Sequence, residues 1–242
     1  LQHRLGTGLL LGLVGSIVAA ALIGALVASF ISHRRGIYYA LLTIAFGQIL
    51  WFVSIKWHSV TGGEDGLLKI ERPPLELFGM RLALTSNETF YYFALTVFSV
   101  VLVFLWRLVH SPWGRVLRAI KQNELRSAFV GYNVWLHKWS AFVLSAALSG
   151  LAGALFAMAQ NSAYPNVMSL HNSGFVVMMV LIGGGLVSFW GPVIGVALFI
   201  LTRDLLGAYT EAWLLWYGLF FMAKQLYGVE LVERKDLPVY HP

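Results

Sequence analysis

The sequence contains no cysteine and few charged residues, since Asp, Glu, Lys and Arg make up 12% of its 242 residues. The lack of cysteine excludes disulfides, thiolate metal sites and a cysteine nucleophile. Soluble domains carry about 25% charged residues, so this chain has too few to cover a surface that faces water. With 58% hydrophobic residues and a mean hydropathy of +0.73, its solvent is predicted to be mainly lipid.

Motifs for catalysis and nucleotide binding are also missing. The sequence shows no Walker motif, no nucleophile paired with a base and no metal-ligand spacing. Its seven histidines fall at predicted loop or interface positions (3, 33, 58, 110, 137, 171 and 241), which argues against a zinc site. The net charge of +6 does not indicate nucleic-acid binding, because the basic residues cluster between apolar runs. We therefore expect no enzyme, metal or cofactor here.

Four uncharged apolar runs predict membrane-spanning helices, each of which needs about 20 residues. They cover 9–31, 37–55, 89–106 and 139–160. Within the second run, Gln48 is expected to form a helix–helix hydrogen bond or, alternatively, to line a pathway. Small residues predict close helix packing. In the first run these are the glycines at 12, 15 and 24. In the last run, small residues spaced four apart form two adjacent rows, 145/149/153 and 146/150/154.

The apolar run from 172 to 202 is interrupted twice, by Gly183-Gly184-Gly185 and by Trp190-Gly191-Pro192. One helix is not expected to continue through both breaks, so we predict two short pieces, as two shallow crossings or one interrupted crossing. Broken helices at membrane depth occur where backbone is buried in protein or lines a cavity. The glycines therefore either line a path or only permit tight packing.

The predicted fold is an all-α integral membrane protein, with residues 1–242 as a single transmembrane domain. The chain begins at Leu1 rather than Met, which leaves room for further N-terminal spans. We therefore expect a helical bundle of roughly six to eight spans, with broken helices near 183–192.

The segment 107–138 is a basic island between two spans and sets the predicted orientation. Because short loops rich in Lys and Arg face the cytoplasm, this loop and Arg34-Arg35 are assigned to the inside. Alternation then places 56–87 and 161–171 outside. The island holds six basic residues against the single acid Glu124 (Arg107, Arg115, Arg118, Lys121, Arg126 and Lys138).

A helix is predicted within the island, starting at Ser111-Pro112 and stopping at Gly131. Arg115, Arg118, Gln122 and Arg126 would form one basic face along it. Charge alone favours an anchor for phosphate headgroups. The alternative is a coupling helix that inserts into a groove on a motor protein.

Several motifs resemble branched-chain amino acid ABC importer permeases. The island carries Gly114-Arg115-Val-Leu-Arg118-Ala119-Ile120, then Asn123-Glu124, Arg126 and Gly131, close to that family's cytoplasmic loop. The segments Thr61-Gly62-Gly63-Glu64-Asp65-Gly66 and 38–46 are similar to the LivM-type subunit rather than its LivH-type partner. Including the Gly183 and Trp190 motifs, the resemblance covers roughly 9–222. Family members usually carry additional N-terminal spans. Their last span is also usually longer, whereas here Lys224-Gln225 ends a short last apolar piece, 212–223, early.

The resemblance implies a permease subunit in a bacterial or archaeal inner membrane, which imports branched-chain or related apolar amino acids. Its implied partners are a LivH-type permease, two cytoplasmic ATPases that bind ATP and Mg, and an extracytoplasmic binding protein. The implied coupling residues are Gly114, Arg115, Arg118, Ala119, Ile120, Glu124, Arg126 and Gly131. The candidates for the path or the binding-protein contact are Gly62, Gly63, Asp65, Gly66, Gln48, Gly183, Gly184, Gly185, Trp190 and Gly191.

Two points stay open at the level of sequence. Asp65 is either a turn-forming residue or a contact for an ammonium group. The chain is alternatively a permease for urea or short amides, or an ion-coupled secondary transporter. The last class would be expected to place charged residues within its spans, and these spans have none.

Overall fold

The computed structural model describes residues 8–68, 70, 75–77, 80–82, 86–184, 189–208, 215 and 218–219. Gly185, Lys224 and Gln225 lie outside this set. The chain divides into two compact units, 1–170 and 171–242. The long helices of the first unit are α2 (Leu9–Ile31), α3 (Ile37–Lys56), α5 (Asn87–His110) and α8 (Val134–Gln160).

These four helices are long and apolar enough to cross a membrane, which confirms the four predicted spans. Shorter elements connect them: α4 (His58–Thr61), the 3-10 turn η1 (Gly63–Asp65), β1 (Leu67–Leu68), β2 (Leu75–Leu77), β3 (Met80–Leu82), α6 (Pro112–Gln122), α7 (Glu124–Phe129), β4 (Ser162–Ala163) and the 3-10 turn η2 (Pro165–Met168). The two small antiparallel pairs, β1–β4 and β2–β3, were not predicted. They are additions to an otherwise helical fold.

Helices α2 and α8 form the close-packed pair of the first unit. A Cβ atom on Gly24 would collide with Cβ of Ala146, and one on Gly150 would collide with Cβ of Ala20 and the backbone of Ser16. The backbones approach this closely because both helices carry small residues at the contact. The predicted packing row 146/150 is thereby confirmed. The neighbouring row behaves differently, since a Cβ atom at position 153 would meet nothing within 4 Å.

Side chains extend the contact between α2 and α8 at both ends. Trp139 donates its indole N–H toward the carbonyl oxygen of Ala25 at 3.1 Å and the hydroxyl of Ser29 at 3.2 Å. At the other end, a buried apolar cluster joins α2, α5 and α8 through Leu9, Leu13, Phe90 and Met158. The helix α3, by contrast, has no buried residue among its 20.

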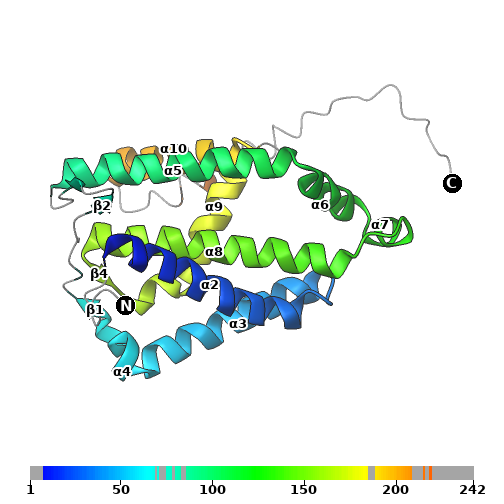
Figure 1. Cartoon of the computed structure of the whole chain (residues 1–242), viewed down its shortest axis with the longest axis horizontal. Helices are drawn as coiled ribbons and strands as arrows, with labels where there is room; N and C mark the ends of the chain where they lie inside the picture. Colours follow the sequence, from blue (N-terminus) through cyan, green and yellow to red (C-terminus); the bar gives the residue numbers. More distant parts are fainter. Residues whose placement is uncertain are drawn as a thin grey trace. The chain divides into compact units, whose positions relative to one another are not determined.

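Each end of the first unit brings together two segments that were predicted on the same side. At one end, β1 pairs with β4 in the register Leu67↔Ala163 and Leu68↔Ser162, which joins the segment after α3 to the segment after α8. At the other end, α6 and α7 lie near the turn between α2 and α3 (Figure 1). The segments that charge assigns to the same side of the membrane thus lie at the same end of the first unit.

The second unit contains two packed helices, α9 (Phe175–Gly184) and α10 (Gly191–Gly207), preceded by a π-helical turn, η3 (Leu170–Gly174). Val180 of α9 and Phe199 of α10 are buried together, with Val176 and Met179 packed on them. The prediction of two short helical pieces is confirmed. Because the pieces pack side by side, they differ from the collinear halves of one interrupted crossing.

Candidate functional site

The helix α6 begins as predicted and packs one face onto the first unit. Ser111 accepts a hydrogen bond from the backbone N–H of Gly114 at 3.4 Å, and Pro112 occupies the first turn. Position 114 has room only for glycine, because a Cβ atom there would collide with the carbonyl oxygens of Leu108 and Val109. Ile120 is buried, and the indole of Trp113 donates to the hydroxyl of Ser140 on α8 at 3.2 Å.

The predicted single helix up to Gly131 is wrong, because it breaks at Asn123. That residue has extended backbone angles (φ −159°, ψ 106°), and its side-chain oxygen accepts from the N–H of Arg126 at 2.9 Å. An Asn side chain that satisfies an orphan donor in this way starts a new helix, here α7. Arg126 therefore lies on a different helix from Arg115 and Arg118, and the three do not share one continuous helical face.

Gly131 ends α7, as the sequence indicated. Its φ of +96° lies in the left-handed region that glycine tolerates. The N–H of Gly131 bonds the carbonyl of Ala128, and the N–H of Tyr132 bonds the carbonyl of Ser127. These two bonds form a Schellman motif, which closes α7 sharply before α8 begins.

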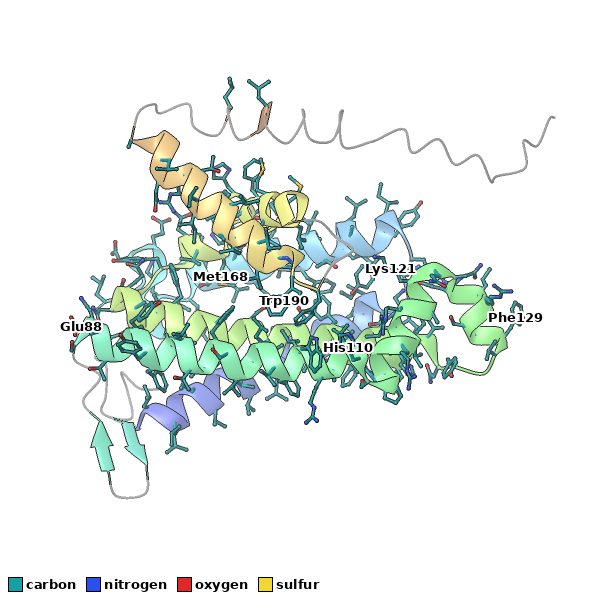
Figure 2. All side chains as sticks on the ribbon, turned by 90° about the horizontal axis from the view of Figure 1, so that it is seen from above. Glu88, His110, Lys121, Phe129, Met168 and Trp190 are labelled. Atoms are coloured by element: carbon teal, nitrogen blue, oxygen red, sulfur yellow. The ribbon has the colours of Figure 1, made fainter. Side chains whose placement is uncertain are left out.

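The outer side of α6 and α7 presents cations beside large apolar side chains. We call Arg115, Leu125, Arg126, Phe129 and Val130 the α6–α7 surface; all five are exposed. Phe129 is 87% exposed and projects at the tip of the unit, opposite the end that carries Glu88 (Figure 2). Exposed large apolar residues grouped with cations are typical of a protein-docking surface.

The remaining predicted coupling residues divide by environment. Arg118 is exposed, but its guanidinium donates to the carbonyl oxygen of Val109 at 3.2 Å and so helps to close the end of α5. Ala119 is exposed on α6. Gly114 and Ile120 face inward, and they therefore support the helix rather than its outer surface.

Glu124 lies in an ion cluster that joins three segments. One carboxylate oxygen lies 2.8 Å from Nε of Arg35, and the other accepts from Nζ of Lys138 at 3.0 Å. Lys138 also donates to the carbonyl oxygen of Arg34 at 2.8 Å and lies 5.3 Å from the ring centre of Tyr39. The start of α7 is thus attached to the α2–α3 turn and to the first turns of α8. Glu124 was predicted as a contact for the motor, and these partners within the chain were not predicted.

An open groove of about 480 Å³ lies beside this cluster. Its walls come from the starts of α3 and α8 and from the inner side of α6, including Tyr39, Ile120, Lys121, Phe142 and Ser145. Ser145, the first residue of the small-residue row 145/149/153, thus lines this groove.

The opposite end of the unit holds the glycine-rich turn 61–66. A side chain at Gly62 would collide with the carbonyl of Gly66, and one at Gly63 with the ring of His58. Gly66 lies against the backbone of Ala163 and Tyr164. All three glycines have positive φ values, between +69° and +81°. The spacing of glycines is thus explained by a compact turn that packs on the segment after α8.

Thr61 anchors this turn, and Asp65 faces solvent. The hydroxyl of Thr61 donates to the carbonyl oxygens of Ser54 at 2.5 Å and Trp57 at 2.8 Å, and it accepts from the N–H of Gly63 at 3.3 Å. Asp65 is exposed, and its carboxylate makes no hydrogen bond or ion pair with any residue that the structure describes.

A second groove, of about 460 Å³, lies next to this turn. Ser54, Val60 and Thr61 form one side, and Gly153, Phe156 and Ala157 of α8 form the other, with residues of β4 and η2. Gly153 faces the groove, which explains why the second small-residue row of α8 does not pack on α2.

The other candidates lie apart from these sites. Gln48 is half-buried on α3 and makes no side-chain hydrogen bond with any described residue. Gly183 and Gly184 close α9, whereas Trp190, which is 51% exposed, and the buried Gly191 stand at the start of α10. Over the described residues, no group of three or more His, Asp or Glu side chains is arranged to hold a metal ion.

A family model described as "Branched-chain amino acid transport system / permease component" matches residues 1–228. The chain belongs to this family. The family comprises membrane permeases rather than enzymes, and the predicted LivM-type resemblance is confirmed.

Three curated relatives show how far the similarity extends. The high-affinity branched-chain amino acid transport permease LivM of Escherichia coli is 30% identical over 90% of this chain and 56% of its own length. The probable LivM permease of Methanocaldococcus jannaschii is 24% identical over 81% of this chain and 57% of its own. The nucleoside ABC transporter permease NupC of Lactococcus lactis is 30% identical over 39% of this chain. The chain spans about half the length of the LivM relatives, and no solved structure matches it.

Proposed function

We propose that this permease-family chain is the LivM-type subunit of an ATP-driven importer that moves branched-chain or related apolar amino acids into the cytoplasm. The observation that carries this proposal is the family match along 1–228. The exposed α6–α7 surface supports it as well. An ATP-driven transport subunit without a nucleotide-binding motif needs a partner that supplies energy, and this surface is a site on which such a partner would dock. The whole bundle, with the segments beyond this chain, would then hold six to eight spans in a single permease domain.

The charges of the first unit support an orientation for this importer. The end with α6 and α7 carries a cluster of cations with Glu124 as its one described acid (Arg34, Arg35, Arg107, Arg115, Arg118, Lys121, Arg126 and Lys138). The sequence between the end of α3 and the start of α5 mixes both signs instead and has no cationic excess (Glu64, Asp65, Glu71, Glu76 and Glu88 against Lys56, Lys69, Arg72 and Arg81). Because cationic loops stay on the cytoplasmic side, the α6–α7 surface faces the cytoplasm and the turn 61–66 faces outward.

The proposed partners follow from this orientation. Two cytoplasmic ATPases, which bind ATP and Mg, would dock on the α6–α7 surface and on the same region of a LivH-type permease. An extracytoplasmic binding protein would meet the turn formed by Gly62, Gly63, Asp65 and Gly66. Gln48 and the segment from Gly183 through Gly185 to Trp190 and Gly191 are the candidates for the translocation path.

Changing the α6–α7 surface tests the motor contact. Arg126→Glu combined with Phe129→Ala is expected to reduce copurification of the ATPase at least tenfold, since clustered anchors lost from an interface cost about 2 kcal/mol or more. Both side chains are exposed, so the amount of folded permease in the membrane should not change. Arg118→Glu is a less selective test, because it also removes the bond to Val109.

A matched change at the other end serves as the control. Tyr91→Ala on α5 removes another exposed aromatic side chain, which is 61% exposed against 87% for Phe129, far from the α6–α7 surface. It is expected to leave ATPase copurification unchanged. Normal ATPase binding and normal substrate-stimulated hydrolysis in the Arg126→Glu/Phe129→Ala variant would contradict the proposed motor contact.

A nucleoside substrate is the second candidate, favoured by the similarity to the permease named for nucleosides. Urea or short amides stay open as a third. Uptake of labelled leucine, uridine and urea, each measured separately with the complete complex, separates the three. Uptake of leucine that valine inhibits supports the amino acid proposal, whereas uptake of uridine or urea without uptake of leucine overturns it.

A further inference from the structure

The groove of about 480 Å³ beside the ion cluster, which we call the inner groove, changes in character along α8. Lys138 lines its mouth, four residues after Val134 at the start of the helix, and Ala141, Phe142 and Ser145 continue the same side at helical spacing. At about 1.5 Å of rise per residue, Phe142 lies about 12 Å along the axis from Val134. Because α8 is long and apolar enough to cross a membrane, the groove is charged where it meets the cytoplasm and uncharged where it enters the hydrocarbon.

The helix α6 forms the opposite wall, and it contributes one cation to this inner side. Leu117, Ile120 and Lys121 line the groove together, because residues three and four apart lie on one side of a helix. Arg115, by contrast, belongs to the outer α6–α7 surface. Lys121 is exposed and lies toward the end of the unit that carries Phe129 (Figure 2). Its ammonium group makes no hydrogen bond or ion pair with any residue that the structure describes, so its donors are available to a ligand.

Glu124 is the acid in the described lining of the inner groove, and its charge is already compensated. One of its carboxylate oxygens lies 2.8 Å from Nε of Arg35, and the other lies 3.0 Å from Nζ of Lys138. Two cations therefore face one carboxylate, and Lys121 adds a third positive charge. The mouth of the groove carries a net positive charge, which an anionic ligand would balance.

We propose that the inner groove binds one anionic phospholipid, with its phosphate beside Lys121 and an acyl chain along Ala141 and Phe142. Basic pockets between membrane helices on the cytoplasmic side bind anionic headgroups. The groove also follows the polarity of a phospholipid, whose charge lies at the membrane surface and whose chains point into the hydrocarbon. This inference uses the cytoplasmic orientation proposed above, but it does not depend on the substrate or on the motor.

A lipid fits the inner groove better than a soluble anion or a segment of the motor does. An inorganic phosphate would meet Lys121 but would leave the wall formed by Ala141 and Phe142 uncovered. A peptide that reached Phe142 would carry backbone N–H and C=O groups to a depth where they lack hydrogen-bond partners. With a lipid in the groove, α6 contacts lipid on its inner side and protein on its outer side.

Native mass spectrometry of the complete permease complex in detergent tests the lipid site. Phosphatidylglycerol or phosphatidylcholine is titrated into the complex, and the number of bound lipids is counted. We expect one phosphatidylglycerol to be retained in preference to phosphatidylcholine. Lys121→Gln should weaken its binding about fivefold, as expected for one lysine near an anionic lipid. Because Lys121 is exposed, the variant should assemble as the parent does.

A matched variant and a photoreactive lipid locate the site. Arg115→Gln removes the same charge from the outer side of α6 and is expected to leave lipid binding unchanged. Phosphatidylglycerol with a photoreactive group in its acyl chain should crosslink to the segment 138–145 of α8, and Lys121→Gln should reduce this crosslink. Unlabelled phosphatidylglycerol is expected to suppress the crosslink, whereas an excess of inorganic phosphate is not.

Three outcomes would overturn the lipid site. Equal losses in Lys121→Gln and Arg115→Gln would show attraction to the whole cationic end rather than to the groove. Displacement by inorganic phosphate would assign the groove to a soluble anion. Absence of a crosslink within 138–145 would show that protein fills the groove in the complete complex. Lipid binding is read whether or not an ATPase copurifies or leucine is transported, so failure of the proposed function leaves this result distinct.

Discussion

The helices α2 and α3 follow each other in the chain, have 23 and 20 residues and are both apolar enough to cross a membrane, but they are held in different ways. Six residues of α2 are buried, and none of α3 is. Residue size at the helix contact accounts for this difference. Ser16, Ala20 and Gly24 recur every four residues along α2 and meet Ala146 and Gly150, whereas large side chains cover α3. In lipid, apolar surface alone does not drive helices together, so small residues decide which pair approaches closely.

The largest effect is expected from Gly150→Leu at the α2–α8 contact. Even a Cβ atom there collides with Ala20 and the backbone of Ser16, so a leucine forces the helices apart. Overpacking costs about 1–3 kcal/mol or more, and we expect a clear fall in folded yield and in the apparent melting temperature in detergent. Gly153→Leu, on the same helix but facing the groove, is the matched control. Equal melting temperatures for the two variants would show that α2 and α8 are not locked as described.

A smaller, reversible effect is expected from Gly24→Ala. The added methyl group collides with Cβ of Ala146, which should destabilise the pair by about 1–2 kcal/mol. Ala146→Gly removes the opposing methyl group, and the double variant should regain most of the lost stability. Thermal unfolding of the four proteins of this cycle measures the interaction. Additive losses, without rescue, would place the two residues out of contact.

The smallest effect is expected from Gly47→Leu on α3. Its position is open, so the change should alter the stability of the first unit by about 0.5 kcal/mol or less, as for other unburied sites. Melting temperature measured beside Gly150→Leu gives the comparison directly. A large loss in the assembled complex, but not in the isolated chain, would instead locate a partner against this face of α3.

The sequence predicts the spans well because long apolar runs are set by membrane thickness alone. The first span, 9–31, matches α2, whereas α5 begins at Asn87 and α8 at Val134, since polar and aromatic residues extend helices beyond the hydrocarbon region. The break at Asn123 had a local signal, an Asn that caps the N–H three residues later. The basic residues keep a regular helical spacing across Asn123, so their spacing alone predicts one continuous helix.

The ion cluster could not be predicted in the same way. Glu124 was predicted as a coupling residue, but its partner Arg35 comes from the turn between α2 and α3, and Lys138 reaches the carbonyl of Arg34 across 104 positions of sequence. Contacts of this kind depend on how helices are placed in three dimensions. The pairing of β1 with β4 was missed as well. It joins two segments far apart in sequence, and strands of two residues show no periodic pattern.

The helices α6, α7 and α8 all begin with a side-chain cap, provided by Ser111, Asn123 and Asn133. Each cap satisfies a backbone donor within its own segment, so these helix starts need no lipid or partner protein for that bond. The α6–α7 surface is therefore preorganised. A partner that docks on it does not have to order the backbone first, and the conformational entropy lost on association is correspondingly small.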